Sequence, residues 1–119
     1  MGNRVTVNIS SREFETPINV YSHWSGSEIY PVVQGVLEMT DRVGDGSYLC
    51  AQIVNAVFTQ LGYDGKLGFG LWAAQLESDR WDDNPTMFVD ADTGQWRFDE
   101  ESDWYSRDTR IDEIMGESF

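Results

Sequence analysis

The sequence has little positive charge, and this shortage limits what the protein can bind. Eight Lys and Arg residues stand against 21 Asp and Glu, and Lys66 is the only lysine. Binding to nucleic acid or to an anionic membrane depends on Lys and Arg side chains that displace counterions from phosphates. With a formal net charge of −13, the sequence predicts no direct nucleic-acid binding and no attraction to an anionic membrane.

Cysteine and histidine each occur once, as Cys50 and His23. A single cysteine excludes a disulfide within the chain and suits a reducing compartment, so we expect a cytoplasmic protein, located in the host cell if its origin is viral. A structural zinc site needs about four nitrogen or sulfur ligands, which one Cys and one His do not supply. The sequence therefore predicts no metal and no other cofactor.

Long apolar runs are absent as well. No stretch approaches the ~20 residues of a membrane-spanning helix, and the chain does not open with the charged and then apolar pattern of a secretion signal. We therefore expect no membrane segment. A hydrophobic share of 40% in 119 residues is nevertheless enough for one folded domain with its own core.

Hydrophobic periodicity predicts an α+β domain in the order β-β-α-α-β-β-β. The expected strands are 4–9, 18–24, a strand starting at 68, 87–91 and 95–98. The expected helices are one that begins between 27 and 30 and ends before the glycines at 44–46, one at 47–62, and a short one at 107–115. We predict a mainly antiparallel sheet with two helices packed on one face. Residues 1–100 form this single domain, and Ser47 is expected to cap the second helix.

The negative charge is concentrated near the end of the chain, where residues 101–119 are predicted to form an acidic extension. Residues 1–76 carry a net charge of −3, whereas residues 77–119 carry −10. One hypothesis is adaptation of the whole surface to a salty cytoplasm, and the other is a surface that engages a basic partner. A partner surface would combine acids with aromatic side chains. Its candidate residues are Asp79, Trp81, Asp82, Asp83, Asp99, Glu100, Glu101, Asp103 and Trp104.

The segment NVYSHWSGSEIYP, residues 19–31, raises the question of whether His23 is a functional group. A histidine that acts as a general base needs a nucleophile and an orienting acid. Neighbouring residues on a strand point to opposite faces, and the chain has no G-x-S-x-G elbow. We therefore predict a structural histidine and no catalytic residues. The alternative is a site for a small molecule or for hydrolysis that is formed by Tyr21, His23 and Trp24.

The triplet Asp92-Thr93-Gly94 matches the catalytic triplet of aspartic proteases. Only 25 residues follow it, too few for the barrel that such a site requires. The same stretch is also similar to a calcium loop, but Gln95 stands where that loop needs glycine. Asp, Thr and Gly are typical of tight turns, so we predict a hairpin turn.

Four segments carry a resemblance to known sequences: VYSHWSGSEIYPVVQGVL, DGSYLCAQIVNAVF, GFGLWAAQ and DDNPTMFVDADTGQW. Together they resemble small proteins of uncharacterised activity that phages and prophages encode. In those proteins a Y-S-H-W-x-G segment precedes a helix, and a G-[FY]-G-[IL] strand leads to a V-D hairpin. The resemblance covers about residues 18–98, and it implies a viral or proviral origin without implying any chemistry.

Three hypotheses for the function follow. The favoured one is a non-catalytic protein that binds a basic or DNA-binding protein of the host. Its sharper form is an inhibitor that imitates DNA and blocks a host nucleic-acid-binding or defence protein, which requires acids spaced like phosphates on one face. The third is a small-molecule-binding or hydrolytic protein that uses His23.

Overall fold

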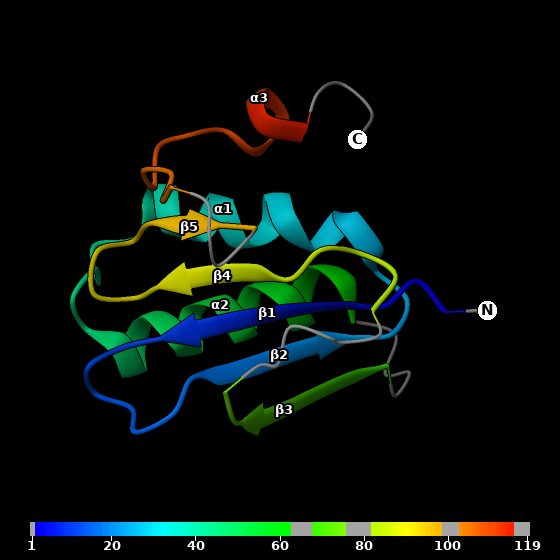
Figure 1. Ribbon diagram of the computed structural model, residues 1–119, viewed down its shortest axis with the longest axis horizontal. Coiled ribbons are helices and arrows are strands. Elements are labelled where there is room, and N and C mark those ends of the chain that lie inside the picture. The colour runs from blue at the N-terminus through cyan, green and yellow to red at the C-terminus, as the bar shows by residue number, and fades with distance from the viewer. Residues whose placement is uncertain (1, 63–67, 76–81, 99–102, 116–119) are drawn as a thin grey trace.

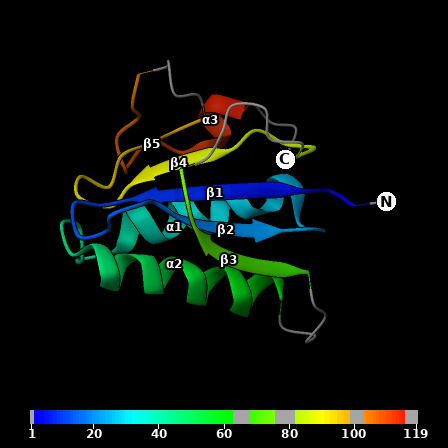
Figure 2. The ribbon, with the colours of Figure 1, turned by 60° about the horizontal axis from the view of Figure 1, so that its bottom comes forward.

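The computed structural model describes residues 2–62, 68–75, 82–98 and 103–115 and shows a five-stranded sheet with two long helices on one face (Figures 1 and 2). The predicted α+β class and the predicted order of the elements are confirmed. In chain order the elements are β1 (Val5–Ser10), β2 (Ile18–Ser22), the 3-10 turn η1 (Gly26–Glu28), α1 (Ile29–Met39), α2 (Gly46–Leu61), β3 (Phe69–Ala73), β4 (Met87–Asp90), β5 (Trp96–Arg97) and α3 (Ile111–Met115).

The strands lie in the order β3-β2-β1-β4-β5, so β1 is central and β3 and β5 are the edges (Figure 1). Three of the four neighbouring pairs are antiparallel, which confirms the predicted mainly antiparallel sheet. The pair β1 and β4 is parallel. This parallel pair arises because the chain returns from the β3 edge to the far side of β1.

The core lies between the sheet and the two long helices. Alternation along β1 directs Val5, Val7 and Ile9 toward the helices, and all three are fully buried. The helices contribute fully buried side chains at helical spacing, which are Ile29, Tyr30, Val33 and Leu37 from α1 and Leu49, Ile53 and Val57 from α2. Each aliphatic side chain buried in this way stabilises the fold by about 1.5–3 kcal/mol.

The opposite face of the sheet is also buried, but its buried side chains are polar. Thr6, Asn8 and Asn19 are almost inaccessible to solvent. The Asn8 side-chain amide donates to the Asn19 side-chain oxygen at 2.7 Å, and the Asn19 amide donates to the carbonyl of Ala74 at 3.0 Å. The Thr6 hydroxyl donates to the carboxylate of Asp82 at 2.6 Å. Both described ends of the β3–β4 connection are therefore bonded to this face.

The start of α2 differs from the prediction. Ser47 does not cap the helix: the helix begins one residue earlier, at Gly46, and its N-cap residue Asp45 makes no side-chain capping bond. Instead, the backbone N–H of Gly46 donates to the carboxylate of Glu13, which comes from the β1–β2 connection. A carboxylate supplied from elsewhere in the fold satisfies one of the free N–H groups of the helix end and favours its positive dipole.

The described residues after β5 pack against the rest of the molecule. Tyr105 and Trp96 form an antiparallel bridge, and their rings lie 4.8 Å apart between centroids. The Arg107 guanidinium donates to the carbonyl of Thr40 at 2.9 Å, and Ile111 is buried in the core. The short helix α3 lies within the predicted range of 107–115 and contacts α1. In the part of the chain that the structure describes, no helix has both the length and the apolar character needed to cross a bilayer.

Candidate functional site

His23 lies directly after β2, where neighbouring groups fix its ring. The Tyr21 hydroxyl is 2.7 Å from His23 Nδ1. The Trp24 ring meets the imidazole edge to face, with centroids 4.5 Å apart. The His23 N–H donates to the carbonyl of Gly68, and the His23 carbonyl accepts from Asn3, both at 2.7 Å. The histidine thus joins the start of the chain, the end of β2 and the segment before β3.

The predicted ligand-binding trio of Tyr21, His23 and Trp24 is therefore brought together in space. The neighbouring serine hydroxyls are not directed at the imidazole, because Ser22 Oγ donates to Ser25 Oγ at 2.6 Å and Ser22 is buried. Among the described residues, no group of three or more His, Cys, Asp or Glu side chains is placed to hold a metal ion. The polar contacts of the trio that are seen here hold chain segments together, and a structural role for His23 stays our prediction.

Two acids of the predicted partner surface are bonded within the chain. The Asp83 carboxylate accepts from the backbone N–H of Arg4 at 2.9 Å and pairs with its guanidinium at 3.3 Å. The hydrogen bonds from Arg4 hold the pKa of Asp83 below its usual value, and the side-chain bond to Asp83 raises the pKa of Arg4. Asp82 accepts from Thr6. These two acids fasten the segment before β4 to the start of β1.

The other residues of that predicted surface have different locations. Asp79, Trp81, Asp99, Glu100 and Glu101 lie outside the described residues. Asp103 is exposed and Trp104 is half-buried. The Arg97 guanidinium lies 4.2 Å above the centre of the Trp104 ring, so a cation of the same chain already uses the face of this tryptophan.

The triplet Asp92-Thr93-Gly94 forms the predicted turn between β4 and β5. The Gly94 N–H donates to the carbonyl of Asp90 at 2.7 Å, and Gly94 has a φ of +79°, a left-handed conformation that favours glycine. The Asp92 carboxylate accepts from the Ser11 hydroxyl at 3.1 Å and from the Arg12 N–H at 2.9 Å. Asp92 thus links the β4–β5 turn to the β1–β2 connection.

Exposed acids gather around α1 and α3, on what we call the acidic side. Its described members are Glu38, Asp103, Asp108, Asp112 and Glu113. A groove of about 340 Å³ runs between the two helices, with Glu38 on the α1 wall and Asp112 on the α3 wall. Arg110 also lines this groove, and its guanidinium pairs with Asp112 at 3.3 Å. Glu38 in turn accepts from the side-chain amide of Gln34 at 3.3 Å.

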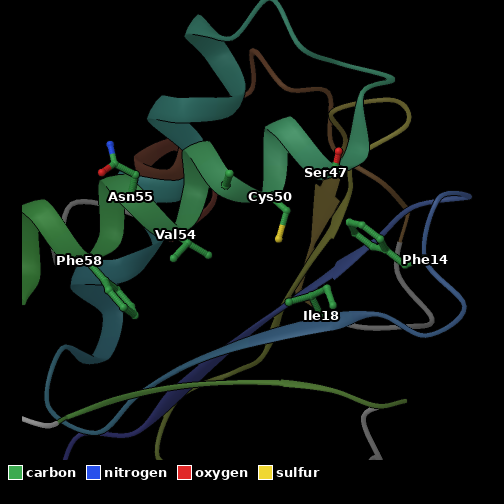
Figure 3. A pocket seen from close by; sticks show the side chains of 8 residues that line it. Phe14, Ile18, Ser47, Cys50, Val54, Asn55 and Phe58 are labelled. Atoms are coloured by element: carbon green, nitrogen blue, oxygen red, sulfur yellow. The ribbon is translucent and has the colours of Figure 1, made fainter.

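On the opposite side of the molecule lie α2 and β3, which contain no charged residue, and we call this the neutral side. Residues 46–62 and 68–75 contain no Asp, Glu, Lys or Arg, although such residues make up 24% of the chain. An apolar groove of about 570 Å³ lies under α2 (Figure 3). It is lined by Phe14, Ile18, Ser47, Cys50, Ala51, Val54, Asn55 and Phe58. In the sequence, the uncharged run over 46–62 is the signal that indicates this side.

Cys50 places a thiol on the wall of the apolar groove. Its side chain is buried, as expected for a cysteine on the apolar face of a helix, and burial raises the pKa of the thiol. A thiol with a raised pKa stays protonated at neutral pH and is a poor nucleophile. The groove is therefore suited to apolar contact and not to thiol chemistry.

Comparison with known proteins gives no match: no family model, no curated protein and no solved structure corresponds to the chain.

Proposed function

We propose that this chain is a non-catalytic, virus- or provirus-encoded protein that binds a basic protein of the host through its acidic side. The observation that carries the proposal is the separation of charge between the two sides of the molecule. The resemblance of residues 18–98 to phage and prophage proteins supports the origin.

The alternative of a uniformly salt-adapted surface explains this separation less well. Such adaptation would place acids on solvent-exposed helix positions throughout the molecule. The exposed positions of α2 are instead occupied by small, amide, hydroxyl and aromatic side chains, which include Ser47, Tyr48, Ala51, Asn55, Phe58, Thr59 and Gln60. The described acids are therefore unevenly distributed, with none on α2, and a local field of one sign is what accelerates the approach of an oppositely charged partner.

The groove between α1 and α3 offers a specific contact within that field. Glu38 and Asp112 come from different helices and line the same groove. A Lys or Arg side chain of the partner that enters here would meet the carboxylate of Glu38, and it would compete with Arg110 for the carboxylate of Asp112.

The test is capture of the partner from an extract of the native host with paired variants. Asp108→Asn with Glu113→Gln removes two charges from the acidic side, and the matched control, Glu15→Gln with Asp64→Asn, removes two charges elsewhere in the sequence. We expect capture at low salt that is lost in molar KCl and at least tenfold weaker capture by the acidic-side variant, with the control unchanged. Equal capture by both variants would remove the acidic side from the account. Competition by short duplex DNA for the captured protein would select the DNA-imitating form of the proposal.

A further inference from the structure

Gln34 of α1 is a buried polar side chain whose oxygen has no hydrogen-bond donor. The residue is 5% exposed, and its amide nitrogen donates to the carboxylate of Glu38 at 3.3 Å and to the carbonyl of Arg107 at 3.0 Å. Both of these groups are acceptors, so the nitrogen has to face them and Oε1 points away from them. In the part of the chain that the structure describes, no donor bonds to this oxygen. A buried acceptor without a donor is uncommon in a folded protein and carries a cost in free energy that a ligand can remove.

Gln34 lines the groove between α1 and α3, and the wall of this groove is open beside it. Pro31, Gly35 and Glu38 line the groove as well, and together with Gln34 they have the spacing of one helix face. Gly35 leaves the middle of that face unfilled, because an added Cβ there would meet no atom within 4 Å. The buried Ile111 lies on the α3 wall. The groove therefore has apolar groups and free space next to an acceptor that has no donor.

The charges of the groove favour a cation as the donor. Its charged members are the carboxylates of Glu38 and Asp112 and the guanidinium of Arg110, which leave one negative charge in excess. Arg110 pairs with Asp112 at 3.3 Å, whereas Glu38 forms no ion pair with a described residue. A cationic donor that bonds to Gln34 Oε1 would also neutralise Glu38. A cation on an apolar stem fits such a groove, because the stem covers apolar surface while the charged end reaches the acceptors.

The arrangement of the acceptors favours an ammonium over a guanidinium. Gln34 Oε1 and the Glu38 carboxylate belong to separate side chains, and Oε2 of Glu38 is already bonded to the amide of Gln34. A guanidinium presents parallel N–H groups that match the two oxygens of one free carboxylate. An ammonium is a compact charge with three donors, which can bond to acceptors on different side chains.

We propose that the groove between α1 and α3 is a binding site for a lysine side chain. Its ammonium bonds to Gln34 Oε1 and to the carboxylate of Glu38, and its alkyl stem lies over Gly35. This inference deepens the proposed function and rests on it for the source of the lysine, which is the surface of the basic partner. The site itself is a property of this chain and can be tested without the partner.

NMR titration of the purified chain with Nα-acetyl-lysine N-methylamide, at constant physiological ionic strength, is the test. The signals of the Gln34 side-chain amide and of the Gly35 backbone N–H should shift and saturate. The corresponding arginine derivative carries the same charge and should bind more weakly by roughly threefold or more. The lysine derivative that is acetylated on Nζ has no charge and should give no saturable shift. Equal affinity for the lysine and arginine derivatives, or no saturable shift with lysine, would overturn the proposal.

Variants of the groove show where the lysine binds. Gly35→Leu fills the open space on α1 without a clash at Cβ, so it should abolish the saturable shift of Gln34 and leave the circular dichroism spectrum unchanged. Glu38→Gln should weaken lysine binding at least tenfold. The matched control is Glu15→Gln, which removes an exposed acid of the β1–β2 connection and should leave lysine binding unchanged. Equal weakening by Glu38→Gln and Glu15→Gln would mean that lysine responds only to net charge, and this would overturn the site.

The titration and the host capture fail separately. Capture that depends on the acidic side, together with no lysine binding in the groove, would overturn this inference and leave the proposed function in place. Saturable lysine binding that Gly35→Leu abolishes, together with no capture of a host protein, would confirm the site and overturn the proposed function.

Discussion

The carboxylate of Asp83 joins the segment before β4 to the start of the chain by accepting from both the backbone N–H and the guanidinium of Arg4, at 2.9 and 3.3 Å. Arg4 directly precedes β1, and Asp83 lies in the part of the β3–β4 connection that leads into β4. Asn84 strengthens the junction, because its side-chain amide donates to the carbonyl of Arg4 at 2.9 Å. The start of the central strand and the segment before β4 are thus fixed to each other.

This junction predicts a stability that depends on pH. The folded-state pKa of Asp83 is lowered by its bonds to Arg4, relative to about 3.9 for an unfolded Asp. A lowered pKa stabilises the fold fully above the unfolded value, and the contribution is lost as the pH falls through the folded value. Asp83→Asn should therefore lower the melting temperature at pH 7 and have little effect near pH 2.5. Asp103→Asn, which removes an exposed acid outside the junction, is the control and should not lower the melting temperature at pH 7.

Two glycines should respond in opposite directions to the same substitution. Gly94 has a φ of +79°, and a Cβ there would lie 3.0 Å from Arg107 Cδ. Gly94→Ala should lower the free energy of unfolding by about 1–2 kcal/mol because of the left-handed conformation. Gly35 lies inside α1 with nothing within 4 Å of an added Cβ. Gly35→Ala should raise the free energy of unfolding by about 0.5–1 kcal/mol. Urea denaturation measures both free-energy changes. A change of the same sign for Gly94→Ala and Gly35→Ala would contradict this account of the β4–β5 turn.

Replacement of His23 separates a structural role from a binding role. His23→Gln keeps a group that can bond to Tyr21 and should leave the fold and partner capture largely unchanged. His23→Ala removes the bond to Tyr21 and the contact with Trp24, and it should lower the free energy of unfolding by about 1–2 kcal/mol. Thermal denaturation and capture are measured on the same samples. Complete loss of capture by His23→Gln at an unchanged melting temperature would show that the histidine is a binding residue.

Salt should stabilise the folded chain itself. A net charge of −13 on a domain of 119 residues produces self-repulsion, which salt screens with a Debye length of about 8 Å at physiological ionic strength. The melting temperature of the chain should rise between dilute and molar KCl. A flat or falling curve would mean that self-repulsion is not a significant destabilising force here.

Local sequence patterns predicted the elements well, because periodicity acts over a few residues. The alternation of Val5, Val7 and Ile9 and the turn at 92–94 both appear in the structure as expected. The parallel pairing of β1 with β4 and the edge position of β3 depend on contacts between distant segments, which periodicity does not encode. The same limit explains why Ser47 was wrongly expected to cap α2. The acceptor at this helix end is Glu13, which lies 33 residues before Gly46 in the sequence.

The candidate sites show the same division. Adjacency along the chain brought Tyr21, His23 and Trp24 together as expected. The partner surface was inferred from charge counts and the aromatic residues near them. Such counts do not reveal that Asp82 accepts from Thr6 of β1 and that Asp83 accepts from Arg4, just before β1. The neutral side was visible in the sequence as an uncharged run, but only the fold shows that α2 and β3 share one surface.

The measurement that tests the division into two sides most directly is host-protein capture at low salt by two variants side by side. The acidic-side variant, Asp108→Asn with Glu113→Gln, should lose most of the capture, and Leu71→Lys, a change at a half-exposed residue of the neutral side, should retain it. The opposite pattern, with capture lost on changing Leu71 and kept on removing the acidic-side charges, would place the partner on the neutral side and contradict the account.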